Sequence, residues 1–125
     1  MKRIYAIIFY SILCICAFAQ GWPTNYGGVM LQGFYWDSYT DTKWTNLESQ
    51  ADELSQYFNL IWVPQSGNCN TTGNVMGYMP VYYFDQNSSF GTQAELKSMI
   101  KTFKDKGLGT IADVVVNHRN NLGVN

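Results

Sequence analysis

Three short and nearly continuous apolar segments stand out along this sequence. They cover residues 29–36, 60–63 and 110–116. A strand with one face in water alternates apolar and polar residues, whereas a strand buried on both faces is apolar at most positions. The three segments therefore predict strands of a parallel sheet that is covered on both faces.

Two helical segments lie between these strands. The first has one apolar face at three- and four-residue spacing, which consists of Leu47, Ala51, Leu54 and Phe58. The second begins at a capping box, with Thr92 as the N-cap and Glu95 at the third helical position, and ends near Gly107. Its apolar face consists of Leu96, Met99, Ile100 and Phe103. Both patterns predict helices that cover a sheet.

The predicted order is strand, helix, strand, loop, helix, strand. The loop covers residues 65–91 and has no clear period, and loops this long inside a domain are usually functional. Helical crossovers favour an α/β fold, either an open doubly wound sheet or a (β/α)8 barrel. A complete barrel needs roughly 200–250 residues. A chain of 125 residues would therefore hold an incomplete barrel, with its first three β/α steps.

The N-terminal segment has the pattern of a secretory signal peptide. Lys2 and Arg3 precede an apolar run over residues 4–18, and Ala17 and Ala19 fit the small residues before a cleavage site. Cleavage is expected between Ala19 and Gln20, which predicts a secreted or periplasmic protein. A membrane anchor is the alternative, although the run is shorter than the roughly 20 residues that span a bilayer. Lipidation is a second alternative, because Cys14 and Cys16 lie in the run.

Charge and cysteine content exclude several classes of protein. The formal net charge is −1, which does not suit a nucleic-acid binder. After cleavage only Cys69 remains of three cysteines, so an exported chain has no internal disulfide. Cys69 is interpreted as a structural thiol, because a nucleophile needs a nearby base and the only histidine, His118, is distant in sequence.

Polar and aromatic residues follow the predicted strands, where ligands bind in both candidate folds. Asp113 is either a buried structural anchor or a catalytic acid. Asn117 is either a turn residue or a ligand for Ca²⁺, and His118 is either structural or part of a site. Six aromatic side chains beside loops suit either sugar stacking or ordinary packing; they are Trp36, Tyr39, Trp44, Tyr78, Tyr82 and Tyr83.

The segment Asp-Val-Val-Val-Asn-His at residues 113–118 resembles the first signature region of the α-amylase superfamily of glycoside hydrolases. Four further segments resemble plant-type and bacterial α-amylases in the same order. They lie at residues 32–36, 61–66, 77–80 and 90–97. Together these matches extend over most of residues 28–121 and imply a (β/α)8 barrel.

The resemblance also implies roles for single residues. Tyr78 would stack on the sugar at the cleavage subsite, and His118 would hydrogen-bond that sugar. Trp36 and Met79 would line the cleft. Asn117 would supply one ligand to a structural Ca²⁺. Asp113 would then be a buried anchor that faces the catalytic centre, and not a catalytic acid.

The activity implied by the resemblance is endo-acting, retaining hydrolysis of α-1,4-glucosidic bonds in starch and related glucans. In this family the catalytic carboxylates come from later barrel strands, which would lie beyond Asn125. Residues 20–125 are therefore expected to be the N-terminal part of a catalytic domain and to be inactive alone. Starch or an α-glucan oligosaccharide is the expected partner. No nucleic acid, partner protein or, after signal cleavage, membrane is expected.

Two alternatives to this function stay open. The chain could be a non-catalytic secreted carbohydrate-binding protein derived from an amylase. Its parent enzyme could also be a transglycosylase, because the residues that choose between water and a sugar acceptor are not within this sequence.

Overall fold

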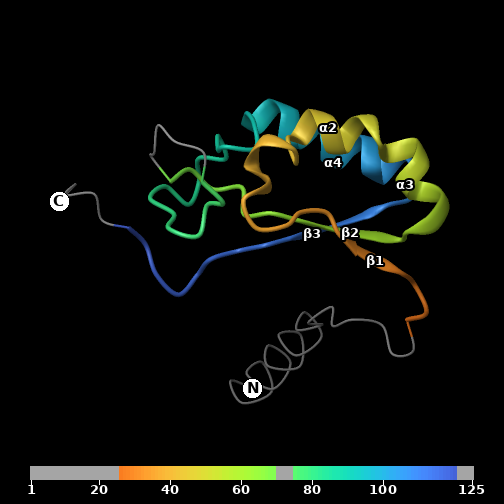
Figure 1. Cartoon of the computed structure of the whole chain (residues 1–125), viewed down its shortest axis with the longest axis horizontal. Helices are drawn as coiled ribbons and strands as arrows, with labels where there is room; N and C mark the ends of the chain where they lie inside the picture. The colour runs from red at the N-terminus through yellow and green to blue at the C-terminus, as the bar shows by residue number, and fades with distance from the viewer. Residues whose placement is uncertain (1–25, 70–74, 121–125) are drawn as a thin grey trace, which may run out of the picture.

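The computed structural model describes residues 26–69 and 75–120, which form a parallel sheet with helices on one face (Figure 1). Its strands are β1 (Met30–Gln32), β2 (Leu60–Val63) and β3 (Gly109–Ala112), in the order β1-β2-β3. Leu31 pairs with Ile61, and Ile61 pairs with Thr110. The predicted parallel α/β sheet is confirmed. The predicted signal segment, residues 1–19, lies outside the described residues.

Strands β1 and β3 are shorter than the apolar segments predicted. The last backbone bond of β1 joins the Gly33 amide to the Trp62 carbonyl at 2.8 Å, and the chain then turns into the 3-10 helix η1 (Ser38–Thr40). Beyond β3 the Asp113 amide makes one more bond, 3.3 Å to the Val63 carbonyl. Val116 is 82% exposed. The prediction of a buried strand through residue 116 is therefore wrong, because β2 offers no partner beyond Val63.

The first helical segment is divided into two helices, α2 (Trp44–Ser49) and α3 (Ala51–Tyr57). Gln50 separates them, since its backbone at φ −92° and ψ 0° departs from helical geometry. The predicted apolar face is nevertheless present, because Leu47, Ala51 and Leu54 are buried.

Helix α4 (Gln93–Asp105) has the start and the end that its sequence predicts. The Glu95 amide donates to the Thr92 hydroxyl at 3.2 Å, and the Thr92 amide donates to the Glu95 carboxylate at 2.7 Å, which completes the capping box. At the other end Gly107 has φ 79°, and the Leu108 amide bonds to the Phe103 carbonyl at 2.9 Å. These bonds form a Schellman motif, which turns the chain towards β3.

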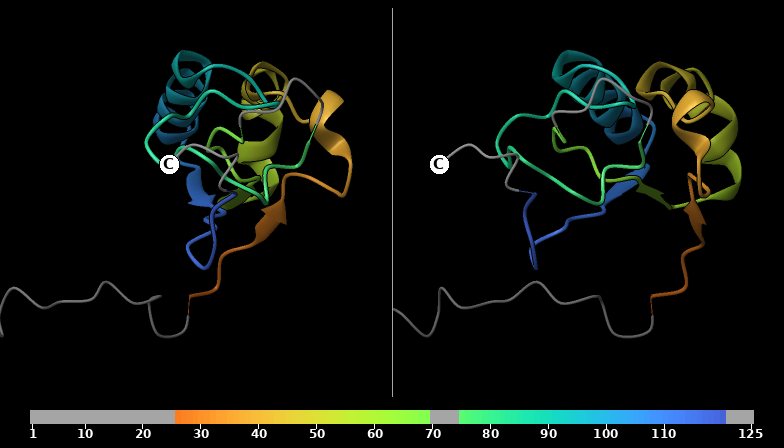
Figure 2. Two further views of the ribbon diagram at one scale, coloured as in Figure 1. Left: turned by 90° about the vertical axis from the view of Figure 1, so that its left-hand side faces the viewer. Right: turned by 60° about the vertical axis from the view of Figure 1, so that its left-hand side comes forward.

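The core lies between the sheet and the three α-helices, as two further views show (Figure 2). Its fully buried side chains include Trp44, Ile61, Phe90, Met99 and Phe103. Ile100, predicted on the buried face of α4, is 39% exposed. It lies at the edge of the buried face of α4, one turn after Leu96.

Coverage of the sheet on both faces is wrong for the described residues, because their helices lie on one face only (Figure 1). Met30 is 48% exposed, and Trp62 is half-buried against the edge of Phe34, with ring centroids 5.3 Å apart.

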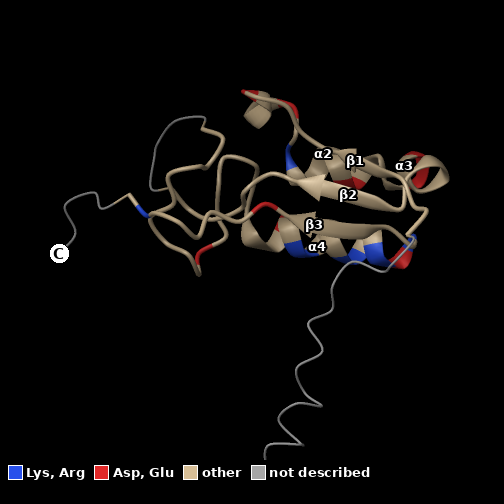
Figure 3. Cartoon of the chain, turned by 90° about the horizontal axis from the view of Figure 1, so that it is seen from below, with Lys and Arg blue, Asp and Glu red and all other residues tan. Residues whose placement is uncertain are grey.

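The outer face of α4 is basic (Figure 3). Lys101 pairs with Asp105 on the same helix, and Lys106 pairs with Asp52 of α3. Among the helices of residues 26–69 and 75–120, none is both long and apolar enough to cross a bilayer.

Candidate functional site

The candidate site lies at the carboxyl ends of the strands. Trp36 follows β1, Tyr78 lies in the segment after β2, and Asp113 directly follows β3. Parallel strands deliver the residues after them to the same edge of a sheet, which is where ligands bind in folds of this kind. Residues far apart in the sequence therefore meet here.

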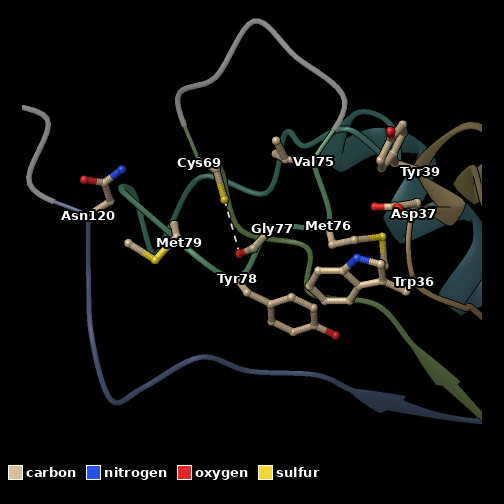
Figure 4. A pocket seen from close by; sticks show the side chains of 10 residues that line it. All are labelled: Trp36, Asp37, Tyr39, Cys69, Val75, Met76, Gly77, Tyr78, Met79 and Asn120. Carbon is tan, nitrogen blue, oxygen red and sulfur yellow. Dashed lines mark hydrogen bonds between the residues drawn. The ribbon is translucent and has the colours of Figure 1, made fainter.

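Tyr78 is the centre of this arrangement. Its ring lies parallel to the indole of Trp36, with centroids 5.9 Å apart and planes 2° from parallel (Figure 4). Its hydroxyl donates a hydrogen bond to Asp113 Oδ2 at 3.1 Å. Burial, reinforced by the nearby Asp113 carboxylate, raises the pKa of Tyr78 to about 12. The phenol therefore stays protonated and keeps donating at neutral pH.

His118 approaches Tyr78 from the backbone side. Its Nε2 lies 2.7 Å from the Tyr78 carbonyl oxygen. A carbonyl only accepts, so Nε2 carries the proton and Nδ1 of the neutral ring is left as an acceptor. The Tyr83 hydroxyl donates to the His118 carbonyl at 2.8 Å, which fixes the histidine backbone as well.

A cavity of about 410 Å³ opens beside the Trp36–Tyr78 pair. Its lining comprises Trp36, Asp37, Tyr39, Cys69, Val75, Met76, Gly77, Tyr78, Met79 and Asn120 (Figure 4). Trp36 and Met79 are 70% and 52% exposed. Volumes of roughly 300–1,000 Å³ are usual for small-molecule sites. The cavity is mostly apolar, with polar groups at a few positions.

The floor of the cavity is held by Gln65 and Cys69. Gln65 Nε2 donates to the Gly77 carbonyl at 2.7 Å, and the Cys69 thiol lies 3.2 Å from the same oxygen. Gly77 has φ 96°, a conformation that glycine adopts without strain. These contacts set the backbone from which Tyr78 projects. Burial raises the pKa of the Cys69 thiol, in keeping with a structural role.

Several sequence-based expectations need correction. Trp44, considered for sugar stacking, is fully buried against Phe90, with centroids 5.3 Å apart, and belongs to the core. Tyr39 also packs on the core, although it reaches the cavity. Asp113, expected inside a buried strand, is half-buried and lies just after β3. Its hydrogen-bond partner there is the hydroxyl of Tyr78.

Asn117 is not drawn into the cluster. Its side chain is exposed and makes no hydrogen bond within the described residues. Within residues 26–69 and 75–120, no three histidine, cysteine or acidic side chains gather as a metal site.

Sequence reasoning missed three residues that line the cavity, Val75, Met76 and Asn120. Met76 is 5% exposed and packs beside Trp36 (Figure 4). Its position next to Gly77 in the sequence was the available signal. Asp37, which follows the first predicted strand, also lines the cavity and has φ 66°, a left-handed conformation that is uncommon outside glycine and asparagine.

Three curated relatives are similar to this chain. Alpha-amylase 3, chloroplastic, of Arabidopsis thaliana is 36% identical over 93 residues, which are 73% of this chain and 10% of the relative. Probable alpha-amylase 2 of the same plant is 29% identical over 92 residues, or 73% and 22%. The alpha-amylase of Bacillus licheniformis is 24% identical over 132 residues, or 94% and 26%.

The chain is homologous to part of the alpha-amylases. It spans between a tenth and about a quarter of the length of these relatives. No protein-family model matches the sequence.

Solved structures support the same fold. Alpha-amylase I from Eisenia fetida matches with a TM-score of 0.62 at 24% identity, over 74% of this chain and 18% of that one. A MutB mutant in complex with the substrate sucrose matches with a TM-score of 0.61 at 24% identity, over 79% and 18%. The described residues therefore have the fold of part of a (β/α)8 barrel, as the alpha-amylase resemblance predicts.

Proposed function

We propose that this chain is the N-terminal part of a secreted α-amylase, an endo-acting retaining hydrolase of α-1,4-glucosidic bonds in starch and related glucans. The observation that carries the proposal is the cluster of Trp36, Tyr78, Asp113 and His118 at the carboxyl ends of strands that are homologous to alpha-amylases. One structural neighbour, alpha-amylase I from Eisenia fetida, was solved as a variant with maltohexaose, a glucan of the proposed kind.

The chemistry of the cluster suits a pyranose ring. The C–H faces of glucose are apolar and stack on flat aromatic rings, which Trp36 and Tyr78 offer beside a cavity. The edges of glucose carry hydroxyl groups, and His118 Nδ1 can accept a hydrogen bond from one of them. Asp113 orients the Tyr78 phenol through their hydrogen bond. The cluster binds and orients sugar in this proposal.

Bond cleavage would require further residues. Retaining hydrolysis uses two carboxyl groups about 5–5.5 Å apart, one as nucleophile and one as acid and base. Asp113 is engaged by Tyr78 and is assigned a positioning role. The proposal places both catalytic carboxylates on strands after those described, so the chain alone is expected to release no reducing sugar from starch.

Asn117 is the residue that we propose as a calcium ligand. A Ca²⁺ ion takes six to eight oxygen ligands, and among the described residues no three histidine, cysteine or acidic side chains gather around a common point. The exposed Asn117 amide would contribute one oxygen to a site completed by other residues.

Export is proposed from the sequence of residues 1–19, with cleavage between Ala19 and Gln20. Expression in a secreting host and N-terminal sequencing of the released protein would test it. A product that keeps Lys2 and Arg3 would contradict cleavage at this position.

The sugar-binding proposal is tested by titrating the chain with maltoheptaose and following tryptophan fluorescence. Trp36 is the exposed tryptophan of the cluster, so saturable quenching is expected. Tyr78→Ala and His118→Ala should each weaken binding. Tyr57→Ala is a matched control, since Tyr57 is 66% exposed on α3. Unchanged affinity in both cluster variants would contradict the proposed site.

The same titration bears on the alternative of a non-catalytic carbohydrate-binding protein. The observation that favours it is a formed cavity with exposed aromatic rings, within a chain in which Asp113 is already hydrogen-bonded. Saturable binding without starch hydrolysis is expected under both proposals, so affinity and folding separate them. Tight binding by a stably folded chain would support the alternative, whereas weak binding by a poorly folded chain would support a part of a larger enzyme.

A further inference from the structure

The buried side chain of Gln65 connects two separate points of the segment that carries Tyr78. Gln65 lies two positions after β2 and is 4% exposed. Its Oε1 accepts a hydrogen bond from the Gly67 amide, and its Nε2 donates to the Gly77 carbonyl at 2.7 Å. Burying an amide costs free energy unless its polar atoms are hydrogen-bonded, and here both atoms have a partner. Both partners belong to the segment that follows Gln65, so these bonds need no other part of a larger protein.

The chemistry of the two partners fixes which way the Gln65 amide points. A backbone N–H only donates, and a carbonyl only accepts. If the amide were turned over, Nε2 would face the Gly67 N–H and Oε1 would face the Gly77 carbonyl, so both hydrogen bonds would be lost. One orientation of the side chain is therefore specified by the backbone around it.

Two glycines allow the backbone to approach Gln65 this closely. A Cβ added at Gly67 would lie 3.1 Å from Gln65 Oε1, and one added at Gly77 would lie 3.2 Å from the Gln65 carbonyl oxygen. Gly77 also has φ 96°, which residues with a side chain rarely adopt. Gln65, Gly67 and Gly77 thus form one closely packed unit, the Gln65 clamp.

The Gln65 clamp holds the peptide bond that precedes Tyr78. A peptide unit is planar, so the Gly77 carbonyl and the Tyr78 amide nitrogen lie in one plane, and holding the carbonyl fixes that plane. On the other side of Tyr78, His118 Nε2 holds the Tyr78 carbonyl at 2.7 Å. The backbone is therefore fixed on both sides of a ring that lies parallel to Trp36, with planes 2° apart (Figure 4).

We propose that Gln65 is a positioning residue for sugar binding, whose amide sets the direction of the Tyr78 ring without touching the sugar. The inference rests on the proposed function, because it takes the ligand to be an α-glucan. Gln65 is not one of the described residues that line the Tyr78 cavity, so its effect on a ligand must pass through Tyr78. The Cys69 thiol lies 3.2 Å from the same Gly77 oxygen (Figure 4), but a thiol is a weak donor and should contribute less.

The test is a double-mutant cycle on the full 125-residue chain, with maltoheptaose affinity followed by tryptophan fluorescence. Gln65→Met keeps an unbranched side chain and removes both hydrogen bonds. It should weaken binding roughly three- to tenfold, the effect of about one hydrogen bond. In the Tyr78→Ala background the same change should have no further effect. Thr102→Val is the matched control, since it removes a 2.7 Å hydrogen bond to Glu48 on the distant helix α4 and should leave affinity unchanged.

Nuclear magnetic resonance of the free chain gives a second measurement. Gln65→Met should shift the ring signals of Tyr78 and His118, whereas Thr102→Val should not, although both variants lose stability. Gln65→Glu keeps the acceptor for Gly67 and removes the donor to Gly77, because an ionised carboxylate only accepts. It should produce the same ring shifts, and it decides the question if Gln65→Met does not fold.

The outcomes separate this inference from the proposed function. Unchanged affinity and unchanged ring signals in the Gln65 variants would overturn the inference and leave the proposed function standing. An equal loss of affinity with and without the Tyr78 ring would also overturn it, because Gln65 would then act by another route. If the unaltered chain did not bind maltoheptaose, the proposed function would be contradicted and the role of Gln65 in sugar binding with it, even where the ring signals shift.

Discussion

The side chain and the backbone carbonyl of Tyr78 together make three different interactions. Its ring meets Trp36, its hydroxyl meets Asp113, and its carbonyl meets His118. A change at any of these neighbours should therefore be visible at the Tyr78 phenol.

The ionisation of Tyr78 gives the first prediction. Its pKa is raised from 10 to about 12 in the folded chain, mainly by burial and then by Asp113. Between these pH values the unfolded phenol loses its proton while the folded one keeps it, so the Tyr78 contribution to stability is present below pH 10 and is lost as the pH rises towards 12. Ultraviolet absorbance of phenolate should show Tyr78 among the tyrosines that titrate late, together with Tyr35, whose hydrogen bond to Asp41 also raises its pKa.

Asp113→Asn should lower the pKa of Tyr78 but not restore its ordinary value, because burial is the larger cause. Tyr78→Phe should remove one late-titrating group and leave that of Tyr35. A late-titrating amplitude that is unchanged in Tyr78→Phe would assign the pKa of about 12 to another residue.

Gly91 supports a second prediction at this scale. Its φ is 139°, and an added Cβ would lie 2.8 Å from Trp44 Cδ1 in the core. Gly91→Ala should lower the free energy of unfolding by about 2–4 kcal/mol, through backbone strain and overpacking. Chemical denaturation measures this change. Gly27→Ala is the control, since nothing lies within 4 Å of its Cβ position, and an equal loss there would contradict the explanation.

At the scale of the elements, the helices depend on contacts between them as well as on their own sequences. Glu48 of α2 accepts hydrogen bonds from Ser98 at 2.8 Å and from Thr102 at 2.7 Å, both on α4. This carboxylate joins the two helices through residues that are 50 and 54 positions apart in the sequence.

Glu48→Ala should therefore destabilise the chain by about 1–2 kcal/mol, since it removes two hydrogen bonds to a charged acceptor that is partly exposed. Thermal unfolding followed by circular dichroism provides the measurement. Glu53→Ala on α3 is the matched control, because Glu53 is an exposed acidic residue whose side chain forms no hydrogen bond within the described residues. Equal shifts in the two variants would point to lost surface charge and not to the link between helices.

The sequence predicted those elements whose signals are local. The capping box at Thr92 and the glycine end at Gly107 needed only neighbouring residues. The end of β1 and the break at Gln50 depend on contacts with distant backbone, such as the bond from Gly33 to Trp62, which no local pattern contains. The residues around Trp44 in the sequence predicted that it lies beside a loop. In the structure Phe90 packs against Trp44 and buries it.

The site likewise has one part that could be predicted from the sequence and one part that depends on long-range contacts. The resemblance supplied Tyr78, Asp113 and His118, and the strand order explains why they meet. The bond from His118 Nε2 to the Tyr78 carbonyl could not be predicted, because it depends on how the loops after β2 and β3 return to each other.

At the scale of the whole molecule, the sheet of the described residues has open edges at β1 and β3. Val114 and Val116, which continue β3, are 64% and 82% exposed. Unpaired strand edges with apolar side chains favour association with other chains.

The purified chain should therefore associate as its concentration rises, and Val116→Lys should reduce that association by placing a charge beside the open edge. Light scattering across a dilution series measures it. Thr45→Lys adds the same charge at an exposed position on α2 and is the control. If both variants reduced association equally, net charge and not the edge would be responsible.

The hydrogen bonds of the Tyr78 cluster also determine at which stage of folding the site forms. They join residues 35 and 40 positions apart, so each closes a long loop, and the entropy of closing that loop must be offset first by the pairing of β2 with β3. Helix α4 can form early from its local signals, but a chain with α4 alone has no cavity. Protection of the backbone amides around Tyr78 from hydrogen exchange is thus a marker of completed folding. Sugar binding should appear only in the last phase of folding.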